Sequence, residues 1–269
     1  MTAKQHAAEV VQGERFEFGA NWARFLEVLD DERIDLAEAS LKAMLEVDDL
    51  KGKRFLDAGS GSGLFSLAAR RLGAGVHSFD YDPQSVACTQ ALKRRYFPDD
   101  PEWKVEDGSV LDRDYLGRLG RFDVVYVWGV LHHTGGMWDA LGNVAGLVVG
   151  EGSLFIAIYN DQGWVSRYWR MVKRIYARWP LVRWPLLLAH ASYLIGMVWL
   201  VRAMTRRLAL VRGMSLWHDL VDWVGGYPFE VARPEEIVRF LRDRGYTLRE
   251  LKTCAGRHGC NEFVLVRSA

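Results

Sequence analysis

The chain has 269 residues, of which 49% are hydrophobic and 26% are charged, and its formal net charge is +1. This length allows one large domain, or one domain with a sizeable addition, and enough apolar chain to bury a core. The composition excludes disordered, collagen-like and disulfide-scaffold proteins. A net charge so near zero argues against a generic nucleic-acid binder. Three scattered cysteines and the lack of a cationic, apolar leader predict a cytoplasmic protein.

Charge is segregated along the chain. The segment 162–213 holds ten basic residues and no acidic residue, which leaves a net charge of −9 for the other residues. The same segment holds five of the eleven tryptophans. The neutral total therefore combines an acidic part with a basic, tryptophan-rich part.

The acidic part alternates between short hydrophobic strands and helical patterns. Helical periodicity is expected over 16–50, 64–72, 83–96, 137–147 and 234–244. Strands are expected at 54–56, 76–79, 103–105, 122–128, 153–159, 247–251 and 262–266. Strands at this spacing with intervening helices predict an α/β fold with a doubly wound parallel sheet.

A glycine loop follows the first expected strand. Asp57 stands two residues before Gly59, and Gly61 and Gly63 follow before the next helix. Glycines let backbone N–H groups approach a ligand closely at a helix N-terminus. Asp57 would repel a phosphate, but its carboxylate can accept hydrogen bonds from an ammonium group, directly or through water. The loop therefore favours a cationic nucleoside over a dinucleotide.

Two further loops fit a nucleoside ligand. Asp80 ends the second strand about 20 residues after the glycine loop, where an acid can hold ribose hydroxyls. The loop 106–110 follows the third strand, where an adenine edge could be contacted.

Three motifs together resemble the class I S-adenosylmethionine-dependent methyltransferases. They are FLDAGSGSG at 55–63, SFDYDP at 78–83 and FDVVYVWGVLHH at 122–133. The match covers 41–159 and resumes at Phe229, and it is similar more narrowly to small-molecule methyltransferases of the kind found in quinone biosynthesis. The resemblance implies a Rossmann-like seven-stranded sheet with an antiparallel last strand, and S-adenosylmethionine as the cofactor.

The resemblance also implies where the cofactor lies. Its methionine end would lie over the glycine loop, its ribose on Asp80 and its adenine beside Tyr81, while Trp128 would face the sulfonium. The expected cofactor residues are Asp57, Gly59, Ser60, Gly61, Gly63, Asp80, Tyr81, Gly108, Ser109, Val110, Trp128 and Trp22.

The chain is expected to divide into three parts. The cofactor-binding core comprises 51–161 and 227–269, and the segment 162–226 is a basic, tryptophan-rich helical insertion that covers the acceptor site. The segment 1–50 is a helical lid in the resemblance, with Phe18, Asn21 and Trp22 over the cofactor. An ordinary helix start with a buried anchor is the alternative.

Histidines are the candidate catalytic groups. A hydroxyl or amine acceptor usually needs a base, and histidine titrates nearest to neutral pH. His132 and His133 follow the fourth strand, at the sheet edge where ligands bind; the alternative is that one of them caps the following turn. His218, beside Asp219 and near Asp222, is a third candidate. No metal is expected, because the ligand spacing there is loose.

Three other residues are expected to contact the acceptor. Tyr159 and Asn160 end the fifth strand, and Tyr227 lies in the turn-rich segment that returns to the sheet. Asn160 has the alternative of capping the next helix. The sequence around Tyr159 lacks the signature of amino-group methylation on DNA bases.

The basic segment leaves three interpretations open. It is an apolar lid over the acceptor pocket, an interfacial anchor against anionic lipid, or a dimerisation face. Its first part, 164–179, has the spacing of an amphipathic helix, and its centre, 184–201, is uncharged and of borderline transmembrane length. The pattern favours an anionic amphipathic substrate or peripheral contact with the inner membrane surface; no nucleic acid is expected.

The sequence therefore predicts a methyltransferase that moves a methyl group from S-adenosylmethionine to a small or lipid-like acceptor, at oxygen, with histidine-assisted deprotonation. Two other classes stay open. One is a nicotinamide-dependent oxidoreductase on a similar sheet, and the other is a non-catalytic cofactor-binding or membrane-associated module.

Overall fold

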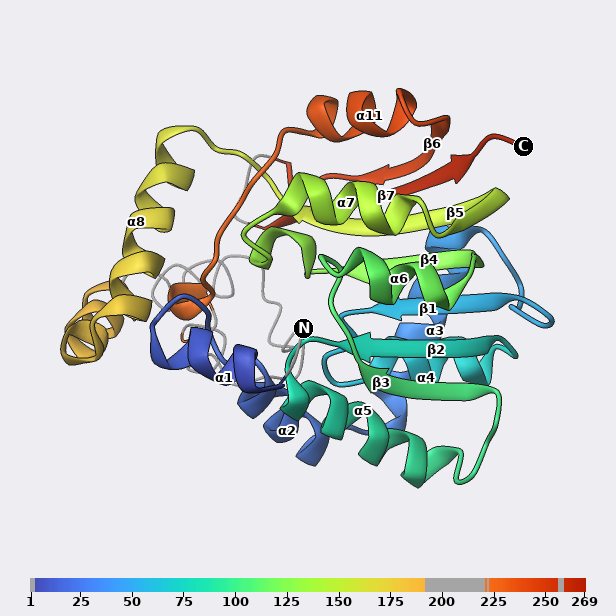
Figure 1. The fold of residues 1–269 in the computed structure, drawn as a ribbon, viewed down its shortest axis with the longest axis horizontal. Helices are drawn as coiled ribbons and strands as arrows, with labels where there is room; N and C mark the ends of the chain where they lie inside the picture. Colours follow the sequence, from blue (N-terminus) through green and yellow to red (C-terminus); the bar gives the residue numbers. More distant parts are fainter. Residues whose placement is uncertain (1–2, 192–220, 222, 256–258) are drawn as a thin grey trace, which may run out of the picture.

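The computed structural model describes residues 3–191, 221, 223–255 and 259–269 (Figure 1). Every strand expected from the sequence is present. β5 begins earlier than expected, because Val148 already pairs with Phe122 before a shift in register. The strands are β1 (Arg54–Ala58), β2 (Gly75–Asp80), β3 (Trp103–Asp107), β4 (Phe122–Trp128), β5 (Val148–Tyr159), β6 (Tyr246–Lys252) and β7 (Cys260–Arg267).

The strands of the described residues form one sheet of seven, in the order β3-β2-β1-β4-β5-β7-β6. Neighbours from β3 to β5 are parallel. The last strand, β7, runs antiparallel to both β5 and β6. The predicted α/β sheet with an antiparallel last strand is confirmed. The strand order reverses between β1 and β4, and open α/β sheets bind ligands at such a reversal.

The helical stretch expected over 16–50 is divided in two. Asp30 ends the first part, because its side chain accepts a hydrogen bond from the Arg33 N–H and caps the next helix. α1 and α6 were not expected from the periodicity. The helices are α1 (Ala3–Val11), α2 (Gly19–Glu27), α3 (Asp31–Leu45), α4 (Leu64–Arg71), α5 (Pro83–Tyr96), α6 (Arg113–Leu119), α7 (Met137–Ala145), α8 (Trp164–Arg178) and α11 (Pro234–Arg242), with short 3-10 turns η1 (Leu131–His133) and η2 (Pro180–Val182).

The side chains of β4 point alternately to the two faces of the sheet and pack in two hydrophobic cores, one on each face. Val125 and Val127 pack in the core that includes α7 and α11. Val124 and Tyr126 pack in the core that includes α3 and α4. Successive side chains of a strand point to opposite faces, so a strand buried on both faces is an unbroken hydrophobic run.

α8 and α1 lie at one end of the sheet, beyond the carboxyl ends of the parallel strands (Figure 1). A third apolar cluster holds this end together, and it joins Trp169 and Tyr176 of α8 to Val224 and Phe229. Within the described ranges, no helix combines the length and the apolar character needed to span a bilayer. The uncharged centre expected at 184–201 lies partly outside the described residues.

Candidate functional site

A cavity of about 490 Å³ lies at the carboxyl ends of the parallel strands. Gly59 follows β1, Asp80 ends β2, Trp128 ends β4 and Tyr159 ends β5, and all four line the cavity. The cavity therefore occupies the crevice where the strand order reverses, as the sequence predicted for a ligand site.

The glycine loop is shaped by backbone angles that other residues avoid. Gly59 and Gly63 have φ of 84° and 81°. A Cβ on Gly59 would lie 2.4 Å from the Val130 side chain, and one on Gly63 would lie 2.9 Å from the Cα of Thr89. Glycine at these positions lets the loop turn tightly and keeps its backbone close to the cavity.

Asp80 ties the glycine loop to the second strand. Its Oδ2 accepts the Gly61 N–H at 2.9 Å, and its Oδ1 accepts the Asp82 N–H at 2.9 Å. Burial raises the pKa of Asp80 to about 6, although these backbone donors act in the opposite direction. The carboxylate lines the cavity and is largely ionised at neutral pH, so it can accept hydrogen bonds from a diol.

Asp57 is held behind this loop by a directional hydrogen-bond chain. The Trp103 indole donates to Ser78 Oγ at 2.9 Å, Ser78 lies 2.8 Å from Ser66 Oγ, and Ser66 donates to Asp57 Oδ2 at 2.5 Å. Because an indole N–H only donates, the chain can run from Trp103 to the carboxylate. Burial, followed by the charge of Asp80, raises the pKa of Asp57 to about 7. Asp57 does not line the cavity.

The expected adenine side also lines the cavity. Tyr81, Gly108, Ser109 and Val110 are all in its wall. The Tyr81 hydroxyl donates to Glu9 Oε1 at 3.0 Å, so the N-terminal helix contacts this side directly.

The N-terminal segment covers the same cavity. The Trp22 ring lies over the glycine loop, since a Cβ on Gly61 would be 3.0 Å from Trp22 Cε2. The Phe18 ring centroid lies 4.8 Å from that of His133. Asn21 is buried and accepts a hydrogen bond from Arg24 instead of lining the cavity.

Arg15 joins the two sides of the cavity, a role that the sequence did not indicate. Its Nη1 donates to the His133 carbonyl at 2.9 Å, and its Nε donates to Glu9 Oε2 at 2.8 Å. Its guanidinium also lies 4.8 Å from the centre of the Tyr81 ring. These contacts form only when the N-terminal segment folds over the sheet, so no local sequence pattern predicts them.

His133 lines the cavity as a neutral imidazole. Its Nδ1 donates to the Pro228 carbonyl at 2.7 Å, which leaves Nε2 as the acceptor nitrogen. Burial lowers the pKa of His133 to about 3, and the charges of Lys173 and Arg15 add to the shift. The pKa of His133 therefore lies below the neutral range expected of a base, and its role in catalysis stays a prediction.

His132 is packed more deeply. It is 1% exposed, its Nδ1 accepts the Tyr159 N–H at 3.4 Å, and burial holds its pKa well below the usual range. The capping alternative is wrong for both histidines, because the Thr134 side chain caps the turn by bonding Leu131 O and Gly136 N.

The part of the cavity wall around Tyr159 is aromatic. Tyr159 and Trp223 line it, with ring centroids 5.6 Å apart, and Phe229 lies 5.2 Å from Tyr159. The fully buried Lys173 donates to the Trp223 carbonyl, and its Nζ lies 4.7 Å from the Trp223 ring centre. A cation is thus packed behind an apolar wall.

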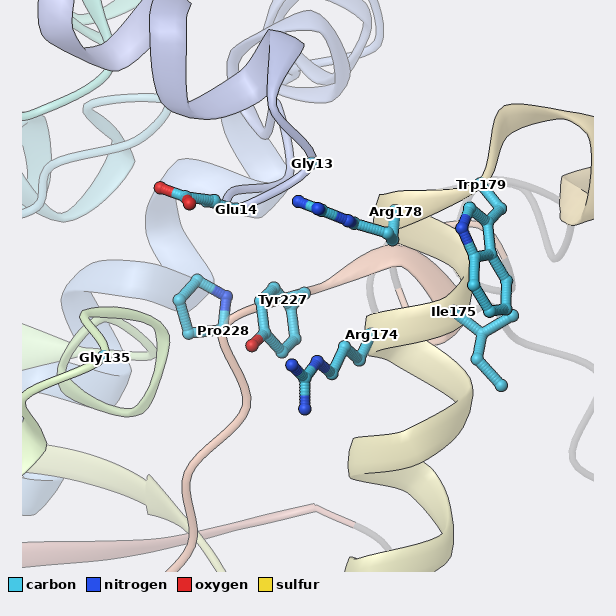
Figure 2. A pocket seen from close by; sticks show the side chains of 9 residues that line it. All are labelled: Gly13, Glu14, Gly135, Arg174, Ile175, Arg178, Trp179, Tyr227 and Pro228. Atoms are coloured by element: carbon cyan, nitrogen blue, oxygen red, sulfur yellow. The ribbon is translucent and has the colours of Figure 1, made fainter.

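The structure does not bring every expected residue to this cavity. Asn160 Oδ1 accepts a hydrogen bond from the Asn261 amide at 3.0 Å, and Ser60 Oγ lies 2.9 Å from Thr89 Oγ1; neither residue lines the cavity. Tyr227 lines a second cavity, drawn in Figure 2. The predicted roles of His218, Asp219 and Asp222 concern residues outside the described ranges, and much of the basic segment lies outside them too. No metal-binding group of His, Cys, Asp or Glu occurs among the residues that are described.

Comparison with known proteins agrees with this arrangement. A family model described as a methyltransferase domain matches residues 56–154. A tRNA U34 carboxymethyltransferase from Pseudomonas savastanoi pv. phaseolicola is 40% identical over 87 residues, which are 32% of this chain and 26% of that protein. One from Ectopseudomonas mendocina is 34% identical over 117 residues, 43% of this chain and 35% of that protein. The chain thus spans about a quarter to a third of these relatives' length.

Two solved structures share the fold across most of the chain. Magnesium protoporphyrin IX methyltransferase from Synechocystis PCC 6803, with bound SAH, aligns with a TM-score of 0.53 and 16% identity over 88% of this chain and 83% of that one. An O-methyltransferase family protein from Burkholderia thailandensis aligns with a TM-score of 0.57 and 13% identity over 99% and 68%. The sheet is therefore the class I methyltransferase fold.

Proposed function

We propose that this chain transfers a methyl group to an oxygen of a small amphipathic acceptor. It carries a methyltransferase domain with the class I, S-adenosylmethionine-dependent fold. The observation that carries the proposal is that Gly59, Gly61 and Asp80 line the same cavity as His133 and Tyr159. A donor bound on the loop and an acceptor beside Tyr159 would share this cavity, and such positioning supplies much of the rate of a displacement reaction.

The lining residues fit S-adenosylmethionine chemically. Asp80 offers carboxylate oxygens for ribose hydroxyls, and the Trp22 and Trp128 rings offer faces that attract a cation. The glycine loop contributes no basic side chain that would repel a sulfonium. When bound, the cofactor supplies an electrophilic methyl group. Asp80 would fix the ribose, and the 108–110 loop would border the adenine.

His133 orients the acceptor in this proposal rather than removing its proton at the outset. With Nδ1 bound to the Pro228 carbonyl, Nε2 is the nitrogen that can accept a hydrogen bond from an acceptor hydroxyl. A histidine with a pKa of about 3 is a weak base, so a second effect is needed to favour the ionised oxygen.

Two cations provide that effect. Lys173 and Arg15 lower the pKa of His133, and the same positive field stabilises an oxyanion on the acceptor. The field also opposes a cationic amine in this position. Oxygen is therefore favoured over a protonated nitrogen as the atom that receives the methyl group.

Trp22 and Phe18 serve as the lid in this proposal. Trp22 lies over Gly61 and Phe18 lies against His133, so the N-terminal segment contacts both the cofactor side and the acceptor side. Covering both sides would exclude water from the reacting atoms.

Contact with a membrane surface belongs to the same proposal. α8 and the residues after it expose large side chains beside arginines: Trp164 is 72% exposed, Trp179 58% and Trp184 65%. Tryptophan and arginine together favour the interface of an anionic bilayer, where an amphipathic acceptor would also gather.

The test is incorporation of labelled methyl groups into a cell extract that is separated into lipid, small-molecule and tRNA fractions. We expect label in an amphipathic compound of the lipid or small-molecule fraction, through a base-labile ester or an ether. Label in tRNA instead would reject this acceptor class and favour the activity for which the carboxymethyltransferase relatives are named.

The same protein is titrated with S-adenosylhomocysteine and with NAD(H). Binding of the dinucleotide alone would reject the methyltransferase and support the oxidoreductase alternative. Binding of S-adenosylhomocysteine without label in any fraction would favour a non-catalytic module.

A further inference from the structure

A second cavity, of about 610 Å³, lies between the N-terminal segment and α8 (Figure 2). Arg174 and Arg178 come from successive turns of α8, and Figure 2 shows both side chains extending into the space between the helix and the facing loops. Tyr227 and Pro228 form part of the opposite wall. None of these residues belongs to the cofactor site described above.

The two arginines carry charge that the described residues do not neutralise. No ion pair joins Arg174 or Arg178 to a carboxylate of a described residue, and Arg178 makes one long hydrogen bond, 3.3 Å from Nη1 to the Gln12 carbonyl. Glu14 also lines the cavity, and its one carboxylate is outnumbered by the two guanidinium groups, so positive charge is in excess. Paired guanidinium groups on one helix face are suited to an anion with several oxygens.

The cavity wall is amphipathic. Tyr227, Trp179 and Ile175 supply apolar surface to the cavity wall. In Figure 2, Tyr227 faces the two arginines, whereas Trp179 and Ile175 extend from the other side of α8. An inorganic ion alone would leave this apolar surface without a partner. An anion attached to an apolar or aromatic group would contact both the apolar surface and the guanidinium groups.

One layer of residues separates this cavity from the methyl-transfer cavity. Pro228 lines the second cavity, and its carbonyl accepts the hydrogen bond of His133, which lines the first. Glu14 in the second cavity directly precedes Arg15 in the first. A molecule bound at both places would lie across the Tyr227–Pro228 segment.

We propose that the second cavity binds an oxyanion of the phosphate type that is carried by the amphipathic acceptor, an inference that rests on the proposed function for the identity of that molecule. Arg174 and Arg178 hold the anion, Tyr227 contacts the adjoining apolar part, and Glu14 offsets part of the positive charge of the two arginines. The soluble source of such a group is a phosphate or diphosphate ester, and the membrane source is an anionic phospholipid.

The test is calorimetric titration of the chain with inorganic diphosphate, with inorganic phosphate and with acetate. We expect diphosphate to bind most tightly and acetate not to bind measurably. Arg174→Gln and Arg178→Gln should each weaken diphosphate binding by about tenfold. Glu14→Gln should strengthen it by about threefold, because a like charge is removed.

Arg167→Gln is the matched control, since Arg167 is exposed on the same helix, loses the same charge and does not line the cavity. An equal loss of diphosphate binding in Arg167→Gln would mean a diffuse field and would overturn the site. Unchanged affinity for diphosphate in both Arg174→Gln and Arg178→Gln would also overturn the site. Binding of S-adenosylhomocysteine should be the same in all four variants and shows that they are folded.

Vesicles of phosphatidylcholine with and without phosphatidylglycerol distinguish the two sources. Binding to the anionic vesicles that free diphosphate displaces assigns the cavity to a lipid headgroup, and diphosphate binding without vesicle binding assigns it to a soluble ester. Vesicle binding without any diphosphate binding would place the arginines at a membrane surface and overturn the cavity site. Diphosphate binding in a chain that methylates no acceptor would uphold the site and reject the proposed function.

Discussion

The side of the cavity proposed to hold the cofactor and the side proposed to hold the acceptor are assembled from different kinds of parts. On the cofactor side, Gly59 and the 108–110 loop each follow a strand directly, Asp80 is the last residue of β2, and backbone N–H groups hold Asp80 in place. On the acceptor side, Arg15, His133 and Trp223 come from distant segments, and the Arg15 side chain donates to the His133 carbonyl. The first side depends on strand order, and the second depends on how the added helices pack.

This difference predicts how the two sides respond to substitution. A change on the cofactor side should alter ligand affinity, whereas a change on the acceptor side should alter turnover. Measurements of affinity and turnover in variants of Asp80, His133 and Trp22 can contradict that division.

The largest effect is expected for Asp80→Asn. The amide keeps the size of the side chain but loses the charge and one acceptor oxygen, so affinity for S-adenosylhomocysteine should fall about 100-fold. Calorimetry measures the change. Asp107→Asn is the control, because Asp107 ends the neighbouring strand, is exposed and does not line the cavity. An equal loss in the control would break the assignment of the ribose to Asp80.

The next effect concerns the pH dependence of stability. Burial raises the pKa of Asp57 from 3.8 to about 7, so the folded chain binds this proton more tightly than the unfolded chain does. Stability is therefore lost as pH rises towards and through 7, and between about pH 5.5 and pH 7.5 the free energy of unfolding should fall by about 2 kcal/mol through this group. Urea denaturation of the ligand-free chain measures it.

Asp57→Asn should remove this part of the pH dependence, because the amide does not titrate. Asp80 also has a raised pKa, of about 6, and would keep its own contribution in the variant. An unchanged slope in Asp57→Asn would show that Asp57 is ionised in the folded chain throughout this range.

A smaller effect is expected for His133→Ala on the acceptor side. Turnover should fall about tenfold, since an orienting hydrogen bond is lost, while affinity for S-adenosylhomocysteine stays the same. With the pKa of His133 at about 3, the wild-type rate should show no histidine inflection between about pH 5.5 and pH 8. An inflection near pH 6.5 that disappears in the variant would instead identify His133 as a general base.

The smallest effect is expected for Trp22→Ala. Loss of the ring over Gly61 should weaken S-adenosylhomocysteine binding about fivefold, and Trp22→Phe should restore part of it. Trp138→Ala, at an exposed tryptophan of α7 outside the cavity, is the control. No change in Trp22→Ala would favour the buried-anchor interpretation of this residue over the lid.

The sequence by itself determined the sheet and the cofactor side. Short hydrophobic runs, glycines with Asp57 before them and an acid at the end of β2 are local signals, and parallel strands bring their carboxyl ends to one edge. The strands, the antiparallel β7 and the placement of Gly59, Asp80 and the 108–110 loop in one cavity followed from those signals and the resemblance they support.

Only the tertiary structure decided the acceptor side. The low pKa of His133 depends on burial and on cations from two other segments, and a residue type carries no information about either. Asn160 pairs with Asn261, and Tyr227 lines the second cavity with Arg174 and Arg178, because β7 and α8 pack against those positions. Local patterns fix strand ends, whereas burial and electrostatic fields arise from contacts between residues far apart in the chain.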